Sequence, residues 1–337
     1  MSISISSMLD RTSMNNQKVL LTVLDHMIWP ILLVVCIGIF LLVPQTFGST
    51  GMLQLILYGS VALGFLVLAE GICLLSGHFD LSIGAIAGFS AMFTAMLISP
   101  DQWGLIQSPV LAVLVLLTVA TLIGVVNGVM ISKVGIDPFL QTLSFLIIFE
   151  GAQIWLSSVP VSNLPDGFTA TGGNAPLSIA LMVLAFVILG VILRYTSFGQ
   201  AIYAVGSDKD SARAVGIKTD RLIITVYALS GFLSGIAGLI LLGRVGSVSP
   251  EMANDLLFPA FAAAVIGGIS LFGGRGKITG ALGGVLLLGV IQSALNISGM
   301  SVNQIQTING IILLTAILLY NTRTNIRDRI LTGEVSA

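Results

Sequence analysis

The distribution of basic residues along the apolar stretches constrains this chain more than any other feature of its sequence. When those stretches are threaded back and forth across a membrane, all but one of the 14 Lys and Arg residues fall on the same side, and Arg244 is the exception. Basic residues collect in cytoplasmic loops, so the asymmetry predicts an orientation as well as a class. We therefore expect a multi-pass membrane protein with both termini in the cytoplasm and with 159–175 and 243–256 outside.

Composition supports a membrane protein and excludes several other classes. The chain is 55% hydrophobic and 9% charged, with a mean hydropathy of +1.04, whereas soluble domains carry roughly 25% charged residues. The net charge of -1 argues against a nucleic-acid partner. Two Cys and two His residues, far apart in sequence, provide neither a disulfide framework nor metal-ligand spacing, so we expect no metal site.

The apolar stretches predict an all-α fold of about ten transmembrane helices, each near the ~20 residues needed to cross the hydrocarbon. We expect a cytoplasmic segment at 1–26, a transmembrane domain at 27–320 and a cytoplasmic tail at 321–337. The second, third and fifth spans are expected to be irregular, and Asp80 or Ser82 can cap the third. The predicted spans are 27–43, 55–75, 81–98, 109–132, 138–158, 176–194, 221–242, 257–272, 279–297 and 305–320.

Glycines spaced four apart suggest where helices pack closely. Lipid offers helices no hydrophobic reason to associate, so small residues that let backbones approach gain importance. Packing is the first interpretation, and sliding surfaces of a moving bundle are the alternative. The pairs are Gly84/Gly88, Gly124/Gly128, Gly231/Gly235 and Gly280/Gly284.

The longest cytoplasmic segment, 195–220, contains a pattern that predicts a short helix at about 207–215. Ser207 or Asp208 can cap it, and Gly216 can end it. Ala212 and Val215 give it a small apolar stripe. A helix of two turns is marginal alone in water, so it must be held either against the bundle or against a partner. The residues alone leave these two possibilities open.

Four stretches carry a resemblance to a known family. They are DLSIG at 80–84, VGIDPFLQTL at 134–143, the loop at 195–217 and VIGGISLFGGRG at 265–276. They resemble the motifs G-G-I-D-L-S-V-G, V-x-P-F-I-x-T-L, G-R-x-x-Y-A-x-G-G-N-x-x-A-A-R-x-x-G-I and I-G-G-T-S-L-x-G-G-x-G. These are motifs of the permease subunits of ATP-binding-cassette importers, in the ribose and simple-sugar branch. The resemblance covers roughly 25–325, with departures at His78-Phe79, Asp137 and Ser207-Asp208.

The resemblance implies a type II importer-like permease and a division of labour. A periplasmic or lipid-anchored binding protein would capture the solute, two permease subunits, identical or related, would form the pathway, and two ATPase subunits would drive it. The loop at 195–220 would then dock on the ATPase through a coupling helix. The implied coupling residues are Gly199, Ala204, Gly206, Asp208, Ala212, Arg213, Gly216 and Ile217.

No catalytic residue or cofactor is expected on this chain, which we interpret as a transport subunit and not an enzyme. The stretch 271–278, LFGGRGKI, looks like a phosphate-binding loop, but Leu271 stands where the first Gly is needed and Ile278 where Ser or Thr is needed. Metalloprotease and serine-hydrolase motifs are also absent from the sequence. ATP hydrolysis is therefore expected on a separate polypeptide.

Polar residues inside the predicted spans are candidates for a solute pathway or for contacts between helices, and the sequence leaves both open. Glu70 and Glu150 could instead form a proton relay, which would favour the alternative function, a proton- or sodium-coupled secondary transporter. Phe139 and Trp155 could stack on a sugar, although packing is the more common role of such residues. The pathway candidates are Asn127, Phe139, Gln153, Gln292 and Asn296.

Overall fold

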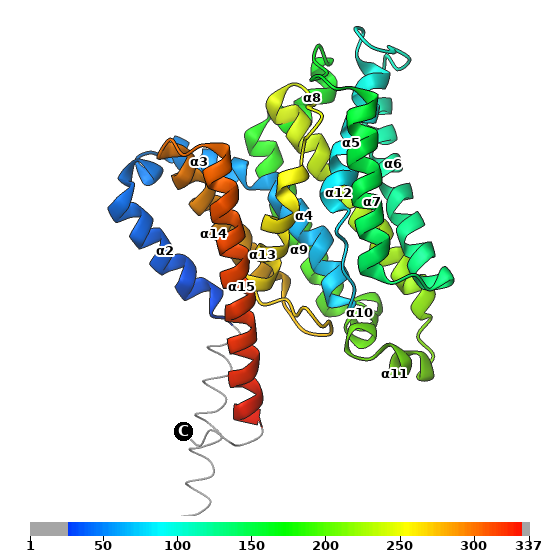
Figure 1. Cartoon of the computed structure of the whole chain (residues 1–337), viewed down its shortest axis with the longest axis vertical. Helices are drawn as coiled ribbons and strands as arrows, with labels where there is room; N and C mark the ends of the chain where they lie inside the picture. Colours follow the sequence, from blue (N-terminus) through cyan, green and yellow to red (C-terminus); the bar gives the residue numbers. More distant parts are fainter. Residues whose placement is uncertain (1–25, 332–337) are drawn as a thin grey trace, which may run out of the picture.

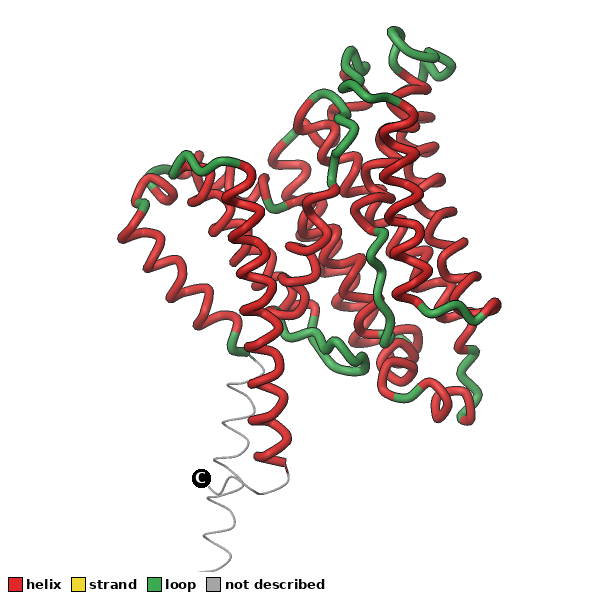
Figure 2. Tube along the Cα trace, viewed as in Figure 1, coloured by secondary structure: helices red, strands yellow, loops and turns green. Residues whose placement is uncertain are grey.

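The computed structural model describes residues 26–331, so most of the predicted segment at 1–26 and the last residues of the predicted tail lie outside the described residues. Within that range the regular secondary structure is helical (Figures 1 and 2). Val161 and Val248 form one isolated antiparallel bridge. The helices are α2 (Ile28–Leu42), η1 (Pro44–Phe47), α3 (Thr50–Gly59), α4 (Val61–Leu75), α5 (Ile83–Ile98), α6 (Pro109–Val129), η2 (Met130–Val134), α7 (Pro138–Leu156), α8 (Asp166–Gly173), α9 (Ala175–Tyr195), α10 (Ser197–Ser207), α11 (Lys209–Ala214), α12 (Thr219–Val245), η3 (Asn254–Leu256), α13 (Leu257–Ile266), α14 (Ile278–Ile297) and α15 (Val302–Leu331).

Seven helical segments of the described chain are long and apolar enough to cross a membrane, and three shorter apolar segments accompany them. Each overlaps one predicted span, which agrees with an all-α polytopic fold, while the number of crossings stays a prediction. The seven are Thr50–Leu75, Pro109–Val134, Pro138–Leu156, Ala175–Tyr195, Thr219–Val245, Ile278–Ile297 and Val302–Arg327; the shorter three are Ile28–Leu42, Ile83–Ile98 and Asn254–Ile266.

Two of the three predicted irregular spans are irregular, and the third is not. The second span breaks at Ser60, whose hydroxyl donates to the Ile56 carbonyl at 2.8 Å, and the third begins only at Ile83, after a non-helical lead-in. The fifth, α7, is a continuous helix. Asp137 accepts from the amides of the first turn and Pro138 occupies the first helical position, so this helix starts cleanly.

Two helix ends differ from the predicted boundaries. The span predicted at 257–272 ends at Ile266, because Gly267 and Gly268 begin a turn in which Gly268 has a φ of +91°. The last helix continues past the predicted limit at 320 as far as Leu331. Figure 1 shows α15 extending beyond the bundle at the end that also carries α10 and α11.

The spaced glycines lie where helices approach closely. The Cα of Gly124 on α6 would lie 3.1 Å from a Cβ added at Gly231 on α12, and a Cβ at Gly128 would lie 2.7 Å from the Ile224 Cα. A Cβ at Gly84 would come within 2.7 Å of the Ala253 carbonyl oxygen. Packing of backbone on backbone, the first interpretation of these pairs, therefore describes this structure.

Helix α12 occupies the centre of the bundle. It packs against α4, α5, α6 and α8, and its Tyr227 is completely buried. By contrast α2, α7 and α15 expose most of their apolar side chains, as expected of helices that face lipid or a second subunit. This arrangement surrounds α4, α5 and α12 with other helices and places polar groups of those helices in the interior.

Candidate coupling and pathway sites

The segment between α9 and α12 folds into two short helices joined at Asp208. The Thr196 hydroxyl accepts from the Gly199 amide at 3.2 Å and begins α10. Asp208 accepts from the Ser211 amide at 2.7 Å and begins α11, and this hydrogen bond lowers the pKa of the Asp208 carboxyl. Gly216, with a φ of +90°, follows its end. The predicted cap and stop are thus found, whereas the sequence did not reveal α10.

The α10 helix packs closely against the rest of the chain at Gly206 and Tyr203. A Cβ at Gly206 would collide with the Leu75 carbonyl oxygen and lie 2.6 Å from the Gly274 amide nitrogen. The Tyr203 hydroxyl donates to the Gly276 carbonyl at 3.0 Å. The end of α4 and the turn at 267–277 therefore pack directly against α10.

The eight predicted coupling residues separate into three groups by exposure. Ala212 is 4% exposed, so it packs inside the chain; of the two possibilities that the sequence leaves open for the apolar stripe, contact with the bundle is the one found at this residue. Val215 on that stripe is 79% exposed. The buried group is Gly199, Gly206 and Ala212; the partly exposed group is Ala204 and Ile217; the exposed group is Asp208, Arg213 and Gly216.

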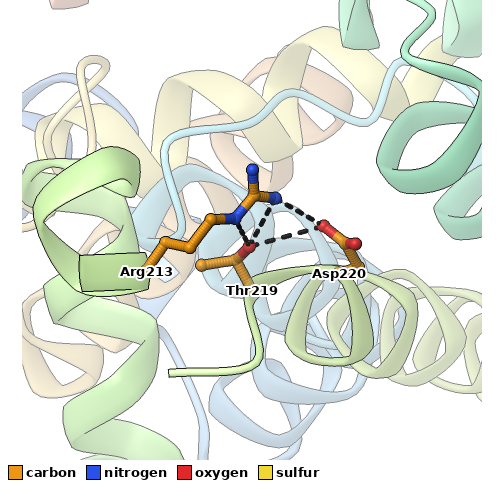
Figure 3. A network of polar contacts seen from close by, with 3 residues as sticks. All are labelled: Arg213, Thr219 and Asp220. Atoms are coloured by element: carbon orange, nitrogen blue, oxygen red, sulfur yellow. Dashed lines mark hydrogen bonds and ion pairs between the residues drawn. The ribbon is translucent and has the colours of Figure 1, made fainter. Parts of the chain in front are cut away.

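Arg213 ties α11 to the first turn of α12. Its guanidinium donates to the Thr219 hydroxyl at 3.0 Å and to the Asp220 carboxylate at 2.8 Å (Figure 3). The Arg213 and Asp220 side chains are 56% and 48% exposed, so this ion pair contributes about 0.2–1 kcal/mol at most. Its effect is to fix the orientation of α11 relative to α12.

A chain of hydrogen bonds crosses the interior at the start of α5. Asp80 is fully buried and accepts from the Ser82 hydroxyl at 2.5 Å and from the Ser230 hydroxyl at 2.7 Å. Asn127 then donates to the Ser82 hydroxyl at 2.9 Å, and Gln141 donates to Asn127 at 3.3 Å. Asn127 therefore joins the lead-in of α5 to α6 and α7 in this structure.

The other pathway candidates are distributed over three places. Gln153 is buried and donates to the Ser249 carbonyl at 3.0 Å, and Phe139 is 50% exposed on α7. Gln292 and Asn296 line one cavity of about 370 Å³ between α3, α4, α12, α14 and α15. The sequence thus predicted two residues of this cavity and three that lie elsewhere.

Arg244 gives the cavity its positive charge. Its guanidinium carbon lies 5.2 Å from the centroid of the Tyr58 ring, and Asp255 lines the same cavity. In the sequence Arg244 stands out only as the exception to the charge asymmetry, although an isolated basic residue at that end of a span could have indicated a site. Hydroxyl and amide groups from Ser60, Ser293 and Asn309 complete the polar part of the lining.

The two intramembrane acids occupy different surroundings. Glu70 is completely buried in α4, while Glu150 on α7 is partly exposed. They come from different helices, and the described structure gives no hydrogen bond that joins them. A relay between them stays untested.

Comparison with known proteins places the chain in a family. A model of the family described as "Branched-chain amino acid transport system / permease component" matches residues 50–320. The chain is 36% identical over 264 residues to a ribose import permease protein of Bacillus subtilis, covering 76% of this chain and 80% of that protein. No solved structure matches the chain.

Two further relatives have similar coverage. The chain is 32% identical over 286 residues to a fructose import permease protein of Rhizobium meliloti, covering 81% of this chain and 78% of the relative. It is also 32% identical over 265 residues to an L-arabinose transport system permease protein of Escherichia coli, covering 77% and 78%. The apolar helices and the family match together define the class of protein, which is a multi-pass membrane permease with a transport role. The chain belongs to the ATP-binding-cassette importer permease family that these relatives represent.

Proposed function

We propose that this chain is the permease subunit of an ATP-driven importer that carries a monosaccharide into the cytoplasm. The observation that carries this proposal is that ribose, fructose and arabinose permeases each match more than three quarters of the chain. A partner ATPase and a solute-binding protein follow from that membership. The proton- or sodium-coupled carrier is disfavoured, because the relatives are components of importers.

The coupling contact is proposed for the exposed edge of α10 and α11. Their buried side is already occupied by α4 and by the turn at 267–277, so an ATPase must use the side that carries Val215 and Arg213. The cap at Asp208 and the ion pair of Arg213 hold this edge in place before any partner binds. Such preorganisation reduces the entropy that association has to overcome.

The solute pathway is proposed to include the cavity that contains Gln292 and Asn296. Its amides and hydroxyls and the charged groups of Arg244 and Asp255 offer the donors and acceptors that a polyol needs, and the Tyr58 ring lies beside Arg244. An importer must release its solute, so we expect weak binding there. Calorimetry on the purified permease should show no submillimolar sugar binding, and a micromolar site would favour a secondary carrier.

The transport proposal is tested in vesicles that contain this permease with its cognate ATPase and solute-binding protein. Ribose, fructose, arabinose, xylose and galactose are supplied outside, and uptake is measured with ATP or a non-hydrolysable analogue inside. We expect uptake of at least one sugar that requires ATP and survives a protonophore. Uptake that persists without ATP and disappears with the protonophore would contradict the proposal.

Both termini and α10–α11 are proposed to face the cytoplasm, because the basic residues collect at that end. Single cysteines at Ser162 and Ser207, both exposed, test this in a chain whose Cys36 and Cys73 have been replaced by Ala. An impermeant thiol reagent applied to sealed cells should label the first and spare the second. Labelling at 207 in sealed cells would refute the orientation.

A further inference from the structure

Two charged side chains of opposite sign line the cavity that contains Gln292 and Asn296. Arg244 lies in the last turn of α12, and Asp255 lies in η3. Among the residues that the structure describes, these two are the charged members of the lining, and amides and hydroxyls make up the rest of its polar part. The two charges cancel, so the cavity combines strong hydrogen-bonding groups with no net charge of its own.

The Arg244 guanidinium is oriented before any solute arrives. Its carbon lies 5.2 Å from the centroid of the Tyr58 ring, whose face attracts a cation, and the Tyr58 hydroxyl donates to the Gly172 carbonyl. A Cβ added at Gly59 would lie 3.7 Å from both terminal nitrogens of the guanidinium. The end of α3 therefore holds the guanidinium on the wall of the cavity.

Neither charged group is paired within the part of the chain that the structure describes. There the side chains of Arg244 and Asp255 make no hydrogen bond and no ion pair, with each other or with other residues, and both are exposed. A guanidinium offers only donors and a carboxylate only acceptors, whereas each hydroxyl of a sugar both donates and accepts. A polyol can therefore bind to both groups without bringing a charge into the cavity.

The size of the cavity suits a single sugar ring. Its volume is about 370 Å³, and at about 30 Å³ for each water-sized group it holds about 12 such groups. A pentose or a hexose is of this size, whereas a disaccharide is too large. Gln292 and Asn296, one turn apart on α14, add amide donors and acceptors to the same space.

We propose that Arg244 and Asp255 together make this cavity select an uncharged monosaccharide and reject sugar acids and amino sugars. The inference rests on the proposed function, because it concerns the same pathway. Arg244 would attract the carboxylate of a sugar acid and Asp255 would repel it, and the ammonium group of an amino sugar would meet the reverse. A charged sugar thus gains no net attraction, while it gives up more hydration on entry than an uncharged one.

The test measures sugar binding to the purified full-length permease in a neutral detergent. Ligand-observed NMR is suited to the weak affinities expected here. Three sugars of matched size are titrated: galactose is uncharged, galacturonate carries a negative charge and galactosamine carries a positive charge. Each result is expressed as the ratio of the affinity for the charged sugar to the affinity for galactose, so that a general loss of binding cancels.

The informative variants are Asp255→Asn and Arg244→Gln, each of which removes one charge and retains a planar polar group. Glu251→Gln is the matched control, because Glu251 is exposed and lies four positions before Asp255 but is not part of the lining. Arg244→Lys keeps the charge and loses the planar pairs of donors, so it separates charge from hydrogen-bond geometry.

We expect the wild-type permease to bind galactose more tightly than either charged sugar. Asp255→Asn should raise the galacturonate ratio by about fivefold, the upper end for one exposed pair of charges, and lower the galactosamine ratio. Arg244→Gln should do the opposite. Arg244→Lys and Glu251→Gln should leave both ratios within about twofold of wild type, because neither changes the charges of the lining.

Tighter binding of galacturonate than of galactose by the wild type would overturn the proposal, and so would unchanged ratios in Asp255→Asn and Arg244→Gln. An equal shift in Glu251→Gln would also overturn it, because net charge at this end of the molecule would then explain the effect. Absence of a galactose signal in the wild type would overturn the assignment of a sugar-sized site.

Uptake in vesicles tests the proposed function separately. ATP-dependent sugar uptake together with unchanged binding ratios would refute this inference alone. Shifted ratios without ATP-dependent uptake would refute the importer and leave the selectivity of the cavity in place.

Discussion

Replacement of Val215 by Ser tests whether the exposed edge of α11 binds the ATPase. Complete burial of a valine side chain stabilises an interface by about 1.5–3 kcal/mol, and 79% of Val215 is available to be buried. The substitution should therefore cost about 1.2–2.4 kcal/mol of binding free energy, or roughly 7- to 50-fold in the dissociation constant. Replacement by Glu should cost more, because an unpaired charge would enter the contact.

The assay titrates the separately purified ATPase against the permease in detergent and measures sugar uptake in parallel. Val245→Ser is the matched control, since Val245 is 64% exposed but lies at the opposite end of α12. We expect Val215→Ser to weaken ATPase binding and lower uptake while the permease keeps its thermal stability. ATPase binding within twofold of wild type for both Val215→Ser and Val215→Glu would refute the coupling assignment.

Three further outcomes follow from contacts inside the chain. Gly206→Ala should lower the free energy of unfolding by about 1–3 kcal/mol, because the added methyl group would meet the backbone at the end of α4. The control Gly190→Ala has open space around it and should be neutral or stabilising in the same melting experiment. Asp80→Asn should lower the free energy of unfolding by about 1–3 kcal/mol, because the new amide group would place a donor where the Asp80 carboxylate now accepts from a serine hydroxyl. An unchanged melting temperature would contradict this. Arg213→Gln and Asp220→Asn should each lower the free energy of unfolding by less than about 1 kcal/mol, with a coupling energy below ~1 kcal/mol in a double-mutant cycle. A larger coupling energy would mean that the ion pair is shielded from solvent.

Periodicity and local chemistry made much of the fold predictable. Apolar stretches located the helices, because an apolar helix in lipid satisfies its own backbone. The cap at Asp208 and the stop at Gly216 were predictable because both depend on residues next to the helix they bound. The early end of α13 was not predicted, since the following glycines are as apolar by composition as the helix itself.

Contacts between distant residues were not predictable in the same way. The sequence places Ala212 on an apolar stripe without showing what the stripe faces, and the structure buries this residue because α11 lies against α10 and α12. Asp80 pairs with Ser230 across 150 positions, and no local pattern indicates that partner. The same is true of Gln292 on α14 and Arg244 on α12, which line one cavity that is completed by residues of other helices.

The short helices α5 and α13 have a consequence for the way the protein is made. At about 1.5 Å per residue, the 16 residues of α5 and the 10 of α13 reach about 24 Å and 15 Å, less than the ~30 Å hydrocarbon thickness. The lead-in to α5 carries Asp80, whose partner Ser230 is synthesised 150 residues later. At roughly 5–20 residues per second, that interval is about 8–30 s. During that interval Asp80 has the donors of Ser82 but not the hydroxyl of Ser230, so we expect α5 to reach its final packing only after α12 has joined the bundle.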